Sequence, residues 1–205
     1  MKKLALLGLA LAVSLGLASA SWAASSDKLT IYVTVSESGA GIELLFGPDY
    51  YFGNMTVNER RVDGDGTQVR IFRNIGSTTS DWQMQMGKWQ DGSNTDLATQ
   101  WTYLTDDPAN PTTLNHVRVS ALWQLTKPSE GDFLADDTVE GPAPDGSPKT
   151  CSATVFGLAS TSDDEKGFNV PVSGERQVHL MLHTPASGSA NLGISVHSEL
   201  VVTAQ

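Results

Sequence analysis

Apolar and polar residues alternate with a period of two along most of the chain after residue 28. Such alternation indicates β-strands that bury one face and expose the other. The longest runs are 29–35, 82–86, 117–125, 178–182 and 194–202, and shorter candidates are 42–46, 68–73, 100–104 and 153–158. Turn-forming Gly, Pro and Asp residues separate the runs, and no window has a sustained helical period. The pattern predicts an all-β fold, an antiparallel β-sandwich of eight or nine strands.

Residues 126–150 interrupt this pattern with a polar, proline-containing stretch. It is either an extended loop or a boundary between two halves. Neither half alone holds enough strands for a closed sandwich, so we predict a single domain over residues 24–205 with a long loop near 126–150.

The first 23 residues have the organisation of a signal peptide. Lys2 and Lys3 form a positive n-region, an apolar stretch follows from Leu4 to Leu17, and small residues at 18–20 and 21–23 suit signal peptidase. The alternative, a retained membrane anchor, is disfavoured because the stretch is short and no stop-transfer pattern follows it. No Cys stands at the cleavage region of a lipoprotein. We therefore predict a bacterial protein that is secreted, periplasmic or at the cell surface, with no membrane span after cleavage.

Acidic residues outnumber basic ones, and the formal net charge is −10 at pH 7. Phosphate backbones and anionic lipids attract clustered Lys and Arg side chains, which this chain lacks. We predict no nucleic-acid partner. Cys151 is the single cysteine, so no disulfide forms within the chain. Its thiol is either buried, which its strand-like surroundings favour, or bridges two chains.

The histidines and acidic pairs are the candidate metal ligands of this chain. His179 and His183 share the polar face of one strand, but about 13 Å separates such positions, too far to ligate one ion. We expect both to be exposed, with His197 and Glu199 as neighbours if the two strands pair. Asp63 and Asp65 can form either a loose calcium site or, as we favour, a plain hairpin turn. We predict no metal site and no cofactor.

Four tryptophans follow the signal peptide. Trp82 and Trp123 fall on apolar strand faces and are predicted core residues. Trp89 lies in a turn-like context, and Trp101 flanks a polar loop. Exposed rings at these two positions can stack on a sugar or on a partner chain, whereas the alternative is packing over a sheet edge. They are the weak ligand-binding candidates.

Two blocks carry a family pattern. The first has Phe-Gly at 52–53 and an alternating strand that ends in Asn-x-Gly at 74–76, and the second has a Gly-containing turn at 170–175 before the strand 178–182 and Thr184-Pro185. These blocks resemble bacterial immunoglobulin-like domains of the ASPM/SPD-2/hydin and choice-of-anchor D groups. The resemblance implies an immunoglobulin-like sandwich, a scaffolding or adhesion role, and no transferable active-site residues.

The sequence thus predicts an exported, non-catalytic structural or adhesive protein of the bacterial surface. Its partners would be other proteins or copies of itself, and an unpaired edge at the terminal strand 193–204 would allow assembly by strand addition. The alternative is a carbohydrate-binding module that uses exposed Trp89 and Trp101, with a glycan as partner. A hydrolase is the third hypothesis. The sequence has no catalytic motif, but a catalytic triad can form from residues that are distant in sequence.

Overall fold

The computed structural model describes residues 27–35, 41–47, 49–63, 70–97, 101–142, 146–186 and 194–205. The predicted signal peptide and Asp65 lie outside these ranges. The described residues form twelve strands and three short 3-10 helices, with no α-helix among them. Within these ranges we find no helix of the length and apolarity needed to cross a membrane.

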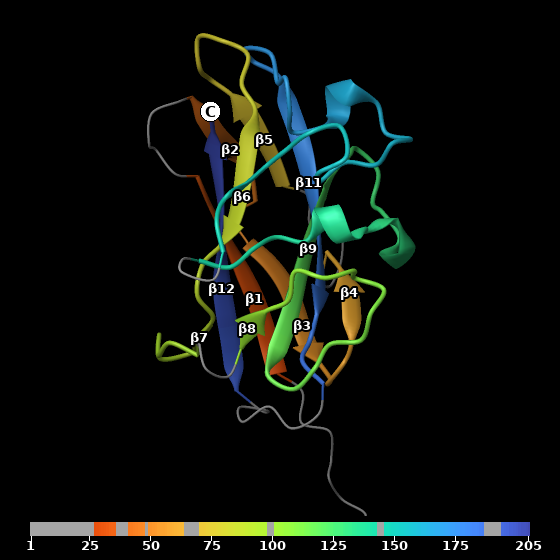
Figure 1. Cartoon of the computed structure of the whole chain (residues 1–205). Helices are drawn as coiled ribbons and strands as arrows, with labels where there is room; N and C mark the ends of the chain where they lie inside the picture. The colour runs from red at the N-terminus through yellow and green to blue at the C-terminus, as the bar shows by residue number, and fades with distance from the viewer. Residues whose placement is uncertain are drawn as a thin grey trace, which may run out of the picture.

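The strands form two sheets that pack face to face (Figure 1). We name each sheet after its central strand. The β12 sheet has the order β10 (Lys149–Thr150), β6 (Trp82–Met86), β12 (Ser195–Ala204), β1 (Asp27–Val35), β3 (Asp49–Met55), with β7 (Gln90–Asp91) also paired to β12. The β11 sheet has the order β2 (Ile42–Phe46), β5 (Arg70–Asn74), β11 (Glu175–His183), β9 (His116–Trp123), β8 (Thr102–Tyr103), with β4 (Arg60–Val62) also paired to β11.

The predicted all-β sandwich is confirmed, but both sheets are mixed rather than antiparallel. β1 runs parallel to β12, and β8 runs parallel to β9. The prediction of eight or nine strands was too low because β3 does not alternate and β4, β7 and β10 are only two or three residues long. The predicted strand at 153–158 is a turn instead, in which Phe156 adopts a positive φ of 57°.

The terminal strand is not an edge. β12 pairs with β1 on one side and with β6 and β7 on the other. Its backbone groups are therefore already used within the sheet, and the prediction of strand addition at 193–204 is wrong.

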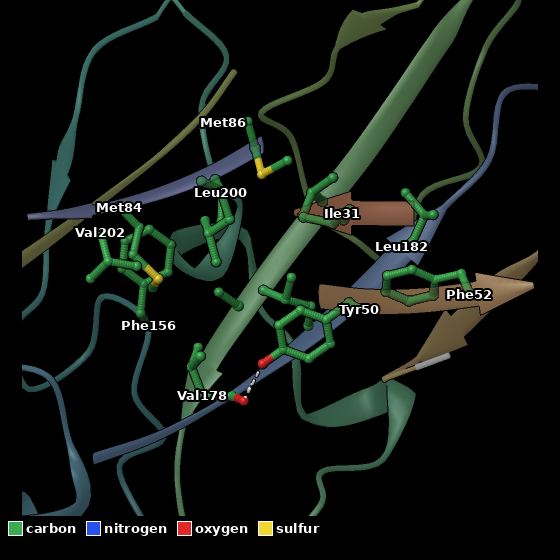
Figure 2. Close-up of a cluster of buried hydrophobic side chains, with 14 of the residues drawn as sticks. Ile31, Tyr50, Phe52, Met84, Met86, Phe156, Val178, Leu182, Leu200 and Val202 are labelled. Atoms are coloured by element: carbon green, nitrogen blue, oxygen red, sulfur yellow. Dashed lines mark hydrogen bonds between the residues drawn. The ribbon is translucent and has the colours of Figure 1, made fainter. Parts of the chain in front are cut away.

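One apolar cluster fills the space between the sheets, with side chains from both of them. Figure 2 shows Ile31 and Leu200 of the β12 sheet in this cluster with Leu182 of β11. The hydroxyl of Tyr50 donates a hydrogen bond of 2.5 Å to the backbone oxygen of Val178, which ties β3 to β11 across the core (Figure 2). Such burial supplies the main driving force for a domain without disulfides.

Trp82 and Trp123 are completely buried, as predicted. Their ring centroids lie 5.1 Å apart in an edge-to-face arrangement, and Phe72 makes a similar contact with each of them. This geometry matches the quadrupoles of aromatic rings. The three rings link β5, β6 and β9 at the centre of the sandwich.

β11 is buried on both faces. Val178, Leu180 and Leu182 face the central core, while Met181 packs with Leu122 and a few other residues into a second, smaller apolar cluster. The second cluster also contains Phe133, which lies between the 3-10 helices η1 (Glu130–Asp132) and η2 (Ala135–Asp137). The third 3-10 helix, η3 (Asp163–Glu165), contacts β11 as well. The segment that interrupts the strand pattern therefore covers the outer face of the β11 sheet around Leu122 and Met181, where the outer face of β11 is buried.

Candidate functional site

The tryptophans proposed as ligand contacts are interior side chains. Trp89 is completely buried and Trp101 is 2% exposed, so the prediction that their rings are exposed is wrong. Their ring centroids lie 5.3 Å apart, and the Trp89 ring also stacks on Tyr103 at 6.1 Å. The alternative of packing within the protein is the better one, although both rings belong to the central core cluster and do not cover a sheet edge. Trp89 looked like a turn residue because Gly87 breaks the alternation that runs through β6.

This aromatic cluster of Trp89, Trp101 and Tyr103 holds the chain segment around Gly87 in place. The hydroxyl of Tyr103 donates to the backbone oxygen of Gly87 at 2.8 Å and shares a hydrogen bond with the Ser198 hydroxyl. Burial raises the pKa of Tyr103, so its hydroxyl stays protonated. Because Trp89 anchors the segment in the core, its neighbours Lys88 and Gln90 lie toward the surface.

A tight turn follows β7. The Asp91 carboxylate accepts the backbone N–H groups of Ser93 and Thr95 at 2.8 and 2.9 Å, and these hydrogen bonds lower its pKa. Asn94 adopts a positive φ of 62°, a conformation that Asn tolerates better than most residues. The turn thus holds the Asn94 side chain beside β12, to which β7 is paired.

Beside this turn, the solvent face of the β12 sheet is hollowed. A hollow of about 560 Å³ adjoins a smaller one of about 230 Å³, and the two share Tyr32, Asn94 and His197. We call the pair the Tyr32 groove. Its other lining residues are Thr30, Lys88, Gln90, Gly92, Ser195, Val196, Ser198 and Glu199.

Two rings form the centre of the Tyr32 groove. Tyr32 on β1 is 43% exposed, and its ring meets His197 on β12 edge-to-face with centroids 5.2 Å apart. The parallel register places Tyr32 opposite Glu199. On the far side of the groove, the ammonium of Lys88 lies 2.6 Å from the carboxylate of Asp96. The groove therefore combines one partly exposed aromatic ring with amide and charged groups.

Asp63 is buried and forms hydrogen bonds within the protein interior. Its carboxylate accepts a hydrogen bond of 2.8 Å from the backbone N–H of Leu180 and bonds the Nδ1 of His179. Asp63 and His179 are both 2% exposed, so the prediction of an exposed His179 is wrong. Both carboxylate oxygens are already used, which leaves Asp63 poorly placed for a calcium ion. In the described part of the chain no group of three metal-ligating side chains comes together.

His183 is also buried, contrary to the prediction. Its Nδ1 lies 3.1 Å from the Nη1 of Arg118, and its Nε2 lies 3.0 Å from the amide oxygen of Asn58. Since Arg118 can only donate, Nδ1 accepts and Nε2 carries the proton in a neutral ring. His197 and Glu199 lie in the other sheet, so the strand pairing that would have made them neighbours of His179 does not occur.

The free thiol of Cys151 is buried, as its surroundings favoured. The indole N–H of Trp123 donates to its sulfur at 3.1 Å, and burial raises the pKa of the thiol to about 12. We expect no reaction with Ellman's reagent in the native chain and one reactive thiol in guanidinium. A Thr154→Cys variant, with an exposed thiol three residues further along in the turn, should react once without denaturant. Native labelling of Cys151 at the rate of Thr154→Cys would contradict this placement.

Two buried groups should give the stability of the protein opposing pH dependences. Burial raises the pKa of Asp137 to about 7, so its stabilising contribution is full at low pH and is lost as the pH rises from about 4 to 7. Burial, together with Arg60 and Arg118, lowers the pKa of His183 to about 4. Its contribution is therefore full above about pH 6.5 and is lost as the pH falls toward 4.

We expect Asp137→Asn to remove the first dependence. The variant should gain stability relative to the unmodified protein as the pH rises from 4 to 7, measured by urea unfolding at several pH values. Asp164→Asn, at an exposed acid, is the matched control and should differ by a constant amount. A constant difference for Asp137→Asn would mean that this carboxyl titrates normally.

No known protein-family model matches the chain, and no curated protein shows significant similarity to it. The site is therefore defined by its geometry. Trp89 and Trp101, which the sequence suggested as ligand contacts, do not line the Tyr32 groove. The sequence did indicate an exposed ring at Tyr32, because this large side chain stands at a polar position of an alternating strand. It did not indicate which residues lie beside Tyr32 in the sheet.

Proposed function

We propose that the chain is an exported, non-catalytic protein of the bacterial surface or extracellular space with an adhesive or structural role. The lysines, apolar stretch and small residues of positions 1–23 support export. An exported chain with a single cysteine must stay folded without an internal disulfide. The large core that the two sheets share can supply that stability.

The contacts of the two buried histidines support a non-catalytic role for these residues. His179 bonds Asp63 through one ring nitrogen and Gln177 through the other. His183 likewise uses both ring nitrogens within the interior. A general base needs a ring nitrogen directed at a substrate, which neither residue offers.

Adhesion is favoured over assembly by strand addition, because β12 is an interior strand. The observation that carries the proposal is the Tyr32 groove, where an exposed aromatic ring stands among polar groups on a rigid sheet. Rings of this kind, which have an apolar body and a polar edge, are enriched where proteins contact other molecules.

We further propose that the sandwich is immunoglobulin-like and related to the ASPM/SPD-2/hydin and choice-of-anchor D groups. The local structure of the Phe-Gly and Asn-x-Gly motifs supports this proposal. Gly53 has a φ of +67° at the bulge between β1 and β3, beside the buried ring of Phe52. In the Asn-x-Gly motif, the Asn74 side chain accepts the Gly76 N–H at 2.9 Å and donates to the backbone oxygen of Val170 at 2.8 Å.

The proposal is tested by producing the full chain in a bacterial host and fractionating the cells. We expect the chain outside the cytoplasm with residues 1–20 or 1–23 removed, as read by intact mass. Size exclusion with light scattering, with calcium and with chelator, then gives its oligomeric state. An uncleaved chain that stays in the cytoplasm would overturn the proposal.

A further inference from the structure

The Tyr32 groove lies over the middle of a sheet, and this restricts what it can bind. The strands beneath it, β1 and β12, are hydrogen-bonded to each other and to further strands on their other sides. No free backbone edge is available there for an added peptide strand. A ligand of this groove must therefore be recognised by side chains.

The charges of the groove exclude two further ligand classes. Among the described residues that line the groove, the one lysine, Lys88, is paired with Asp96, and Glu199 adds a carboxylate. A chain of net charge −10 with this lining has no basic footprint for a polyanion. The lining is also too polar for a lipid, since Tyr32 is its one large exposed hydrophobic side chain.

What remains on this surface is complementary to a neutral, many-hydroxyl molecule. The amides of Gln90 and Asn94 can donate and accept, and the charged groups of Lys88 and Glu199 can bond hydroxyls from either side. The exposed Tyr32 ring offers a flat apolar face of the size of one sugar ring. The volume of the larger hollow lies within the range of about 300–1,000 Å³ that small-ligand sites occupy.

We propose that the Tyr32 groove is a carbohydrate-binding site in which one pyranose ring stacks on Tyr32 and its hydroxyls bond Asn94, Gln90 and Glu199. The inference rests on the proposed adhesive function and names the chemistry of its ligand. It also places sugar recognition on the β1–β12 surface and removes it from Trp89 and Trp101. Those two rings are buried instead, and they pack on the core side of the segment that carries Lys88 and Gln90.

The backbone of the site is ordered before a ligand binds. The hydrogen-bonded Asp91 turn holds the backbone at Asn94, and the pairing of β7 with β12 holds the backbone at Gln90. A backbone that is already ordered loses little conformational entropy when the ligand arrives.

The test is an array of neutral oligosaccharides and polysaccharides, free and attached to protein, probed with the full chain as exported. The two forms of each glycan distinguish a free polysaccharide from a glycoprotein as the source. The affinity for the glycans that bind is then measured by calorimetry. We expect Tyr32→Ala and Asn94→Ala to weaken binding about tenfold or more, and Tyr32→Phe to retain most of it.

Matched controls come from β3 on the same sheet. Tyr51→Ala and Asn54→Ala remove the same side chains outside the groove and should bind as the unmodified chain does. Thermal unfolding of every variant checks that the fold is intact. No binding by the unmodified chain, or equal binding by folded Tyr32→Ala, would overturn the carbohydrate site. If cells still adhere in that case, the adhesive function stands without it, whereas an exported chain that neither adheres nor binds contradicts both.

Discussion

Replacing Trp89 by Ala is expected to destabilise the protein by about 3–5 kcal/mol, the range measured for deletion of a large buried aromatic side chain. The ring is completely buried and contacts Trp101 and Tyr103. Its loss leaves a cavity under the segment that carries Lys88 and Gln90. The midpoint of urea unfolding should therefore fall strongly, and the Tyr32 groove should lose its shape as well.

Lys88→Ala is the matched control, because it changes the adjacent residue on the exposed side. Its one ion pair is solvent-exposed, so the cost should stay below about 1 kcal/mol. An unchanged stability of Trp89→Ala together with lost glycan binding would mean that the Trp89 ring is itself a surface contact. That outcome would support the hypothesis from the sequence that Trp89 is an exposed ligand contact.

Replacing Asp63 by Ala is the second change with a large expected effect, a loss of about 3–5 kcal/mol. The carboxylate is buried with His179 and also accepts the N–H of Leu180. Its removal leaves two buried polar groups without an acceptor. Asp63→Asn keeps one acceptor oxygen for the Leu180 N–H and should lose less, and Asp164→Ala, at an exposed position, should lose little.

The same experiment separates this role from calcium binding. The unmodified chain should unfold at the same urea concentration with calcium and with chelator, because both oxygens of Asp63 have protein partners. A large stabilisation by calcium that disappears in Asp63→Asn would identify an ion site at this turn.

The alternation of residues was sufficient to predict the all-β class and most of the long strands. β6, β9, β11 and β12 lie where the period of two placed them. The pairing of the strands was not available from the same signal, because it depends on contacts distant in sequence. The parallel pair of β1 and β12 joins residues more than a hundred positions apart. A local pattern contains no information about such a partner.

The errors at His179 and His183 have one physical origin. Alternation reports the polarity of a strand face, and polar residues are expected in solvent when a sheet has one open face. Here the loop with η1 and η2 adds a third layer over β11, and buried Asp63 and Arg118, together with Asn58, satisfy the two imidazoles. The candidate site was missed for a related reason, since Tyr32, Asn94 and His197 come from three separate segments.

The central claim is that the exported domain holds other molecules at the cell surface. The most direct measurement is the retention under flow of cells that produce the full chain, on a layer of the same cells. Cells that produce a chain lacking residues 1–23 are the control. We predict markedly greater retention with the full chain and none above background with the control. Equal retention of the two, with the full chain exported and folded, would contradict the account.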